Sequence, residues 1–291
     1  MGLHLLLFCF FWIATTDTVV GARNFTAGCS EVEGLALLKF KRSIKDDFRM
    51  LSSWVGTDCC SWEGVRCDDA TGGVVGLHLR GNITRSYSCD GGYGYGYTSV
   101  LEDNNLIRED YYLVGEEHIG IWKQCHLKKL IVSDNNLGQE MIGPSTNISA
   151  CPHYSLEILD LSGNGLNDSS LESLGRLTSL RILHLESNRL TGQIPKALAR
   201  LRLLQVLDLS FNQLHGPIPT FLGQLIELGL SYNHLSGQIP ESFGTLTGLT
   251  VLNLESNQLT GTIPASLEKL ASLQVAVTIR VSRMKRGREA A

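Results

Sequence analysis

The chain has 291 residues, of which 43% are hydrophobic and 19% are charged, and its formal net charge at pH 7 is -4. This composition supplies enough apolar material for a sizeable core and too few charges for a disordered protein. The small negative net charge argues against a nucleic-acid-binding protein, because neutralising phosphates requires clustered Lys and Arg.

The first segment, residues 1–22, has the pattern of a secretory signal peptide. An apolar run from Leu3 to Ala14 is followed by polar residues and a small-residue cleavage site that ends at Ala22. The run is shorter than the roughly 20 residues that a membrane-spanning helix needs. No later stretch is long enough either. We therefore expect a secreted, extracellular protein, or a plasma-membrane protein if a longer form carries an anchor.

Export to an oxidising compartment favours disulfides. Of the eight cysteines, removal of Cys9 with the signal peptide leaves seven, so at least one thiol is unpaired or bridged between chains. The seven are Cys29, Cys59, Cys60, Cys67, Cys89, Cys125 and Cys151. Four N-x-S/T sequons are candidate glycosylation sites in the same exported setting. They lie at Asn24, Asn82, Asn147 and Asn167.

A repeated pattern, LxxLxLxxNxLxGxIP, occupies residues 74–275, with an irregular Tyr- and Gly-rich insert at about 83–126. The repeated asparagines are Asn164, Asn188, Asn212, Asn233 and Asn257, at spacings of 24, 24, 21 and 24 residues. The repeat of 21 residues has lost three between Leu222 and Leu228, which we interpret as a shortened segment behind the strand. Residues 276–291 form a basic tail, which we expect to be solvated.

The LxLxL alternation predicts a short strand in which Leu183 and Leu185 face inward and the residues between them face outward. Stacked copies would bury these leucines and form a parallel sheet on the concave side of a curved α/β solenoid. The repeated Asn is expected to bond buried backbone groups of neighbouring turns. In GxIP, Gly permits a bend, Ile194 or Ile263 fills the interior, and Pro fixes an extended backbone.

The repeat pattern resembles the plant extracellular leucine-rich-repeat family, which includes receptor-like kinases, receptor-like proteins and polygalacturonase-inhibiting proteins. The stretch from Cys29 to Leu79 is similar to that family's N-terminal cap, with its paired CC, WxGVxC and TGxVxxLxL elements. The resemblance implies a cap over residues 23–73, in which a helix from Glu31 to Ile44 covers the first repeat. It also implies the disulfides Cys29–Cys59 and Cys60–Cys67.

The segment from Cys125 to Leu166 is similar to the middle of receptor-like proteins, where two cysteines flank an irregular repeat. This resemblance implies a Cys125–Cys151 disulfide and leaves Cys89 over. A metal site that adds His126 and His153 is the alternative, but export favours a disulfide over open thiolates. Because no capping cysteines or membrane helix follow the repeats, we expect a shortened receptor-like protein.

No catalytic pattern is recognisable in the sequence. The run GGYGYG lacks the GxGxxG spacing and a following GK[ST], so we interpret it as a loop. There is no GxSxG, HExxH or kinase signature. We therefore predict a protein that is not an enzyme and that needs no cofactor or metal.

Binding is expected at the outward-facing strand positions. One row holds Ile131, Asp160, His184, Asp208, Gly229 and Asn253, and the next holds Ser162, Glu186, Ser210, Ser231 and Glu255. A further position brings Phe211 and Tyr232 together, either to anchor a partner or to pack on each other. The predicted ligand-binding set on the concave face is His184, Glu186, Asp208, Phe211, Tyr232, Asn253 and Glu255.

These features predict an extracellular recognition protein that binds a protein, peptide or glycan on its repeat surface. A co-receptor kinase ectodomain is a further candidate partner, and the resemblance implies a role in defence or developmental signalling. Two alternatives remain open: a secreted polygalacturonase-inhibitor-like protein and a truncated, non-signalling decoy fragment.

Overall fold

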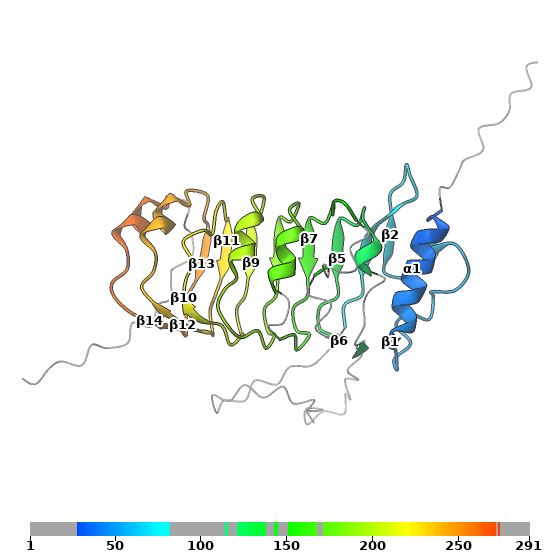
Figure 1. The fold of residues 1–291 in the computed structure, drawn as a ribbon, viewed down its shortest axis with the longest axis horizontal. Helices are drawn as coiled ribbons and strands as arrows, with labels where there is room; N and C mark the ends of the chain where they lie inside the picture. The colour runs from blue at the N-terminus through cyan, green and yellow to red at the C-terminus, as the bar shows by residue number, and fades with distance from the viewer. Residues whose placement is uncertain are drawn as a thin grey trace, which may run out of the picture.

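The computed structural model describes residues 28–81, 114–115, 121–137, 143–144, 151–167, 171–271 and 273. This part of the chain forms an elongated stack of repeats with a helix at its N-terminal end (Figure 1). The predicted signal peptide, the basic tail, Cys89 and the sequons at Asn24, Asn82 and Asn147 lie outside the described residues. None of the described helices has the length and apolar character needed to cross a bilayer.

The cap begins with helix α1, Glu31–Arg42, which is two residues shorter than predicted because Ser43 serves as its C-cap. A capping box starts the helix: the Ser30 hydroxyl accepts the Glu33 N–H, and the Glu33 carboxylate accepts the Ser30 N–H. On its buried face, Phe40 packs against Trp54, which stacks on Trp62 at 5.4 Å between ring centroids. The helix therefore covers an aromatic core rather than standing alone.

Two disulfides close the cap, Cys29–Cys59 and Cys60–Cys67, which confirms the pairing that the resemblance implied. Between them lies the 3-10 turn η1, Cys59–Ser61, followed by strand β2, Val65–Cys67. Strand β2 pairs antiparallel with β3, Val74–His78. The Glu33 carboxylate also accepts the Val74 N–H at 2.9 Å, so one side chain links helix α1 to the first strand of the repeats.

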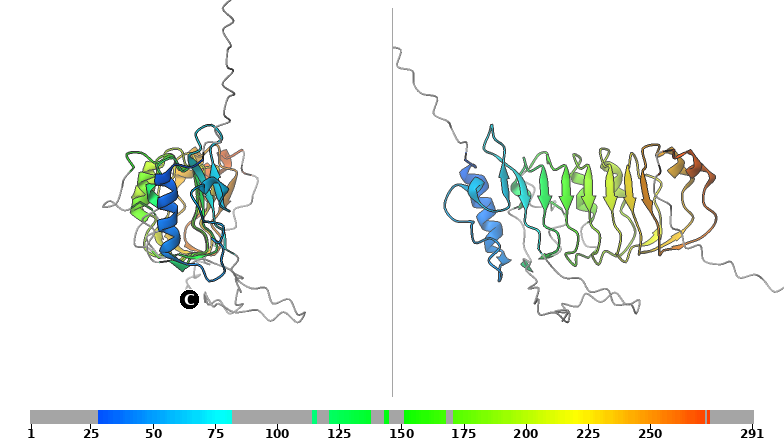
Figure 2. Two further views of the ribbon diagram at one scale, coloured as in Figure 1. Left: turned by 90° about the vertical axis from the view of Figure 1, so that its right-hand side faces the viewer. Right: turned by 180° about the vertical axis from the view of Figure 1, so that it is seen from behind.

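Eight strands form one sheet in the order β13-β11-β9-β8-β7-β5-β3-β2, parallel from β3 onward. The strands are β5 (Lys129–Ile131), β7 (Ile158–Asp160), β8 (Ile182–His184), β9 (Val206–Asp208), β11 (Glu227–Gly229) and β13 (Val251–Asn253). They follow one another along one face of the stack (Figure 2), which we call the sheet face. The central leucine of each strand is fully buried and in register with the next, so the inward-facing leucines were predicted correctly.

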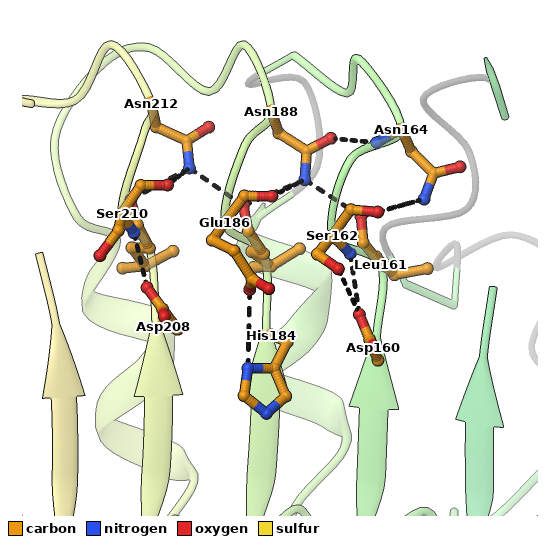
Figure 3. A network of polar contacts seen from close by, with 12 residues as sticks. Asp160, Leu161, Ser162, Asn164, His184, Glu186, Asn188, Asp208, Ser210 and Asn212 are labelled. Carbon is orange, nitrogen blue, oxygen red and sulfur yellow. Dashed lines mark hydrogen bonds and ion pairs between the residues drawn. The ribbon is translucent and has the colours of Figure 1, made fainter. Parts of the chain in front are cut away.

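The repeated asparagines form a buried ladder beside the strand ends (Figure 3). The Nδ2 of Asn188 donates to the carbonyls of Leu161, Leu185 and Glu186, and its Oδ1 accepts the N–H groups of Asn164 and Leu166. Asn164, Asn212, Asn233 and Asn257 likewise reach a carbonyl of the preceding repeat. The predicted role of the Asn in joining neighbouring turns is confirmed.

A second parallel sheet, which was not predicted from the sequence, runs along one edge of the stack (Figure 1). Its strands are β10 (His215–Pro217), β12 (His234–Gly237) and β14 (Gln258–Leu259). Each GxIP glycine here bends the chain at a positive φ, for example 83° at Gly216, where the Gln193 side chain lies over the missing Cβ.

The GxIP prolines precede 3-10 turns. Pro195, Pro240 and Pro264 have ψ values of 142, 131 and 130°, an extended backbone as predicted. The turns are η5 (Lys196–Arg200), η6 (Glu241–Thr245) and η7 (Ala265–Lys269), and an earlier one is η4 (Leu171–Arg176). Ile194 is buried, but Ile263 is 56% exposed. The prediction that Ile263 fills the interior is wrong, because no further repeat among the described residues packs against it.

The shortened repeat lacks a 3-10 turn between β10 and β11, so the loss falls behind the strand as predicted. Turns η4 and η5 pack together, as do η6 and η7. An open recess of about 260 Å³ lies beside η5, where residues 198–204 meet residues 221–225 of the shortened repeat. Its apolar lining consists mainly of Leu198, Leu201, Leu204, Phe221, Leu222 and Leu225. Strand β11 nevertheless keeps its place in the sheet.

The end of the predicted insert is regular. Residues Ile121–Lys123 form the 3-10 turn η2, with Ile121 and Trp122 buried against the stack. A disulfide joins Cys125 and Cys151 near this turn. A small sheet, in the order β1-β4-β6, combines β1 (Ile44–Lys45), β4 (Val114–Gly115) and β6 (Asn136–Leu137). Residues 121–126 thus belong to the repeat stack rather than to an irregular loop.

Candidate functional site

The predicted outward-facing row is in register across the sheet face. Asp160 pairs with His184, His184 with Asp208, Asp208 with Gly229, and Gly229 with Asn253. All five residues are half-buried. Their side chains therefore stand one strand apart, at the roughly 4.8 Å spacing of neighbouring strands.

Local hydrogen bonds orient the side chains of this row. The Oδ1 of Asp208 accepts the N–H of Ser210 at 2.8 Å, and the Oδ1 of Asp160 accepts the N–H of Ser162 at 3.0 Å and its hydroxyl at 2.7 Å. These are the short-range contacts that Asp and Asn make with the backbone two residues on. They direct the carboxylates along the strand, toward the row that contains Glu186 (Figure 3).

His184, Glu186 and Asp208 come together at the centre of the face; we call them the His184 cluster. The Nδ1 of His184 lies 3.5 Å from Oε2 of Glu186, and the side chains of these two residues are 34% and 29% exposed. One ligand atom from each of the three residues lies within 4.8 Å of the others. At 3.5 Å the contact between His184 and Glu186 is longer than a short hydrogen bond, and it is an ion pair when the imidazole is protonated.

The pKa of the His184 imidazole is raised above its ordinary value. The contact with the Glu186 carboxylate is the largest cause, partial burial opposes it, and the charges of Glu186, Asp160 and Asp208 add to it. Neighbouring carboxylates favour the imidazolium because they stabilise its positive charge.

Gly229 makes room for this arrangement. A Cβ at Gly229 would collide with the Asp208 carboxylate and would lie 2.9 Å from the Ser210 hydroxyl oxygen. The Asp208 side chain therefore occupies the space above the glycine of the next strand. The repeat pattern alone does not explain the glycine at this position, whereas the collision of a Cβ with the Asp208 carboxylate does.

Phe211 and Tyr232 stack on each other, with 4.4 Å between ring centroids and 9° between ring planes. They have φ values of 55 and 53°, at a position that is left-handed in six repeats. The others are Asp134, Gly163, Ser187 and Ser256. Of the two roles considered for this pair, mutual packing is present, and both residues remain half-buried.

The rest of the predicted set lies further along the sheet. Asn253 is on β13, which is separated from β9 by β11, and its Oδ1 accepts the Glu255 N–H at 3.1 Å. Asn253 and Glu255 therefore do not join the His184 cluster. Asp160 does flank His184 although it was outside the predicted set, and its place in the row next to His184 was the available signal.

A family model described as a leucine-rich repeat region matches residues 141–291, just over half of the chain. The chain belongs to the leucine-rich repeat family. A second model of this family, the leucine-rich repeat N-terminal domain, matches residues 30–68 and overlaps the cap. A third, a single leucine-rich repeat, matches residues 123–140. This last match places the end of the predicted insert within a repeat.

Two receptor-like proteins from Solanum lycopersicum are among the curated relatives of this chain. The chain is 47% identical to receptor-like protein EIX2 over 57 residues, which is 19% of the chain and 6% of that relative. It is 28% identical to receptor-like protein EIX1 over 172 residues, 56% of the chain and 17% of the relative. The chain thus spans less than a fifth of the length of either relative.

A solved leucine-rich repeat structure with a similar fold is the ectodomain of the plant membrane receptor kinase GASSHO1/SCHENGEN3 from Arabidopsis thaliana, in complex with CASPARIAN STRIP INTEGRITY FACTOR 2. The TM-score is 0.63 at 29% identity, over 86% of this chain and 27% of the receptor chain. The chain is therefore a plant leucine-rich repeat protein of the ectodomain type, a class that typically binds partners and is not catalytic.

Proposed function

We propose that this chain is an extracellular recognition module that binds a protein, peptide or glycan partner on its sheet face, in plant defence or developmental signalling. The contact residues are His184, Glu186, Asp208, Phe211, Tyr232, Asn253 and Glu255. A co-receptor kinase ectodomain is a second partner in this proposal. The predicted signal peptide, residues 1–22, would deliver the protein to the apoplast.

The observation that carries the proposal is the row of half-buried polar side chains in register across the sheet face. At the first position the strands from β7 to β13 carry half-buried polar side chains, apart from Gly229. At the second position Glu186 and Glu255 are half-buried, whereas Ser162, Ser210 and Ser231 are buried. No described element lies over these strands (Figure 2). A partner in extended form could follow the row and meet a new side chain at every strand.

The comparisons support the same role. The relatives of this chain are named receptor-like proteins, and the GASSHO1/SCHENGEN3 ectodomain, which has the same fold, is in complex with another factor. The charge of the sheet face favours one kind of partner, because three carboxylates surround one imidazole at its centre. A partner with basic or hydrogen-bond-donating groups would match that charge.

Exported protein would also carry glycans in this proposal. Asn167 is the one predicted acceptor among the described residues, and it is half-buried in the turn after Leu166. Mass spectrometry of protein secreted from plant cells, before and after treatment with an N-glycosidase, tests this modification. An unmodified Asn167 would remove it from the proposal.

The binding test uses an array of synthetic secreted plant peptides and cell-wall oligosaccharides, probed with the purified chain. A sheet-face variant replaces all seven proposed contact residues with Ala. A matched variant replaces four exposed residues of the 3-10 turns on the opposite side, Lys196, Arg200, Glu241 and Glu268, with Ala. We expect binding of at least one array member that is lost in the sheet-face variant and kept in the matched variant.

Equal binding by both variants, with thermal unfolding unchanged, would place recognition elsewhere and overturn the proposal. Absence of binding to every peptide and oligosaccharide would contradict it as well. If the sheet-face variant unfolds early, single substitutions at Glu186 and Glu255 keep the test interpretable, since both side chains face outward.

A further inference from the structure

We propose that the His184 cluster is a zinc-binding site on the sheet face. This inference is separate from the proposed function, because it concerns an ion and requires no macromolecular partner. It rests on the identity of the three donor groups, on their spacing, and on an unsatisfied carboxylate oxygen within the cluster.

The donor set is one imidazole and two carboxylates, from His184, Glu186 and Asp208. Zinc accepts imidazole nitrogen and carboxylate oxygen, and three protein donors leave a further position open for water or another ligand. Calcium and magnesium fit less well, because they prefer sites built from oxygen alone. The mixed nitrogen and oxygen donor set thus favours zinc over calcium and magnesium.

The spacing of the donors is compatible with one ion. Their ligand atoms lie within 4.8 Å of one another, and the pair His184 Nδ1 and Glu186 Oε2 is at 3.5 Å. Donors of a tetrahedral zinc site with bonds of about 2.1 Å lie about 3.4 Å apart. The first pair already has that separation. The widest separation in the cluster exceeds this value by at most about 1.4 Å, the shift that binding of one ion requires.

Glu186 has room for a further ligand. Its Oε2 is buried and accepts no hydrogen bond, and its contact within the cluster is the 3.5 Å approach of His184 Nδ1. A buried carboxylate oxygen without a donor is costly, and a bound cation removes that cost. Among the described residues, no Lys or Arg forms an ion pair with Glu186, Asp208 or the flanking Asp160.

Two neighbouring groups complete the environment. Asp160, one strand away from His184 on the side opposite Asp208, adds negative charge without supplying one of the three donors. Gly229, on the other side of Asp208, has no Cβ, and the Asp208 carboxylate occupies that space. A proton on His184 competes with the ion, because only the neutral imidazole can bind a metal. Zinc binding should therefore strengthen as pH rises through the pKa of His184.

The test is titration of the purified, untagged chain with zinc chloride at about pH 7.5, followed by isothermal calorimetry. We expect saturable uptake of one ion per chain. Glu186→Gln and Asp208→Asn keep the shape of the side chains and should each weaken zinc binding about tenfold or more, as should His184→Ala. Cobalt(II) replaces zinc in a parallel titration, in which visible absorption bands report nitrogen and oxygen ligation directly.

The matched control replaces His215 and His234 with Ala. These two exposed histidines lie side by side in register on strands β10 and β12, in a different sheet from the His184 cluster. We expect this double variant to bind zinc as the parent chain does. Loss of binding in the control, with retention in Glu186→Gln and Asp208→Asn, would overturn the proposal. Absence of saturable uptake in the parent chain would also overturn it, and would leave partner binding on the sheet face unaffected.

Discussion

Replacing Asn188 with Ala should destabilise the repeat stack more than any other change in the Asn ladder. The Oδ1 of Asn188 accepts two buried N–H groups, those of Asn164 and Leu166, at 3.0 Å each. No other acceptor reaches either group in the described chain. The substitution therefore leaves two buried donors without partners.

The carbonyls that accept hydrogen bonds from Asn188 Nδ2 lose less in this substitution. Leu161 O keeps a bond from Asn164 Nδ2 at 3.1 Å, and Leu185 O keeps one from Asn212 Nδ2 at 3.0 Å. An unsatisfied buried donor costs about 1–3 kcal/mol, so two of them give an expected loss of about 2–6 kcal/mol. That is a large part of the roughly 5–15 kcal/mol that stabilises a typical domain.

Asn257 is the matched comparison. It is half-buried, and its Oδ1 accepts a single N–H, that of Leu235 at 3.0 Å. Asn257→Ala should therefore cost about half as much, and water can replace part of the lost bonding. Urea unfolding with intact disulfides, followed by circular dichroism, measures both variants. A loss for Asn188→Ala below about 1 kcal/mol, or no larger than that for Asn257→Ala, would refute the assignment of the ladder as the main polar support of the stack.

Three further predictions concern the cap, the 3-10 turns and His184. Glu33→Gln removes a carboxylate that accepts hydrogen bonds from Ser30 and from the Val74 N–H. We expect it to lower the free energy of unfolding by about 1 kcal/mol, as measured by thermal unfolding. Glu31→Gln, on the exposed side of α1, should change this free energy little. Gly244→Ala places a Cβ 2.6 Å from the Ser266 carbonyl oxygen and should lower the free energy of unfolding by about 1–3 kcal/mol. At Gly248 an added Cβ meets open space, so Gly248→Ala should be nearly neutral. Similar urea midpoints for the two variants would contradict the packing of η6 on η7. Because the folded-state pKa of His184 is raised, its stabilisation is complete below about pH 6.5 and is lost as pH rises through the raised value. His184→Gln should thus lower stability more at about pH 5 than at about pH 8, and an NMR titration midpoint of His184 at or below about 6.5 would contradict this.

The main sheet could be predicted from sequence because its signal is strictly periodic. Leu183 and Leu185 enclose one outward-facing residue, as do the matching leucines of the later repeats, and a period of two specifies both the strand and its buried face. The disulfides Cys29–Cys59 and Cys60–Cys67 needed the family resemblance, since spacing alone leaves several pairings open. The second sheet escaped prediction because β10 and β12 contain Gly, Pro and Ser rather than an alternating pattern.

The candidate site could be predicted only in part. The repeat pattern places His184, Glu186 and Asp208 on the outer face, but it does not show that their donor atoms converge. Side-chain orientation decides that convergence: the Asp208 carboxylate accepts the Ser210 N–H and lies over Gly229, whereas the His184 imidazole lies against Glu186. Likewise, the exposure of Ile263 depends on what packs beside it, which its own repeat does not encode.

The shortened repeat also shows where the sequence of such a chain can lose residues without disturbing the sheet. Three residues are missing from its back, yet Leu228 stays in register with Leu207 and Leu252. Backbone hydrogen bonding fixes the register and spacing of the strands. The connecting segments behind the sheet tolerate the loss of residues without changing that spacing. Selection can therefore alter one side of the stack without shifting the spacing of the side chains on the other.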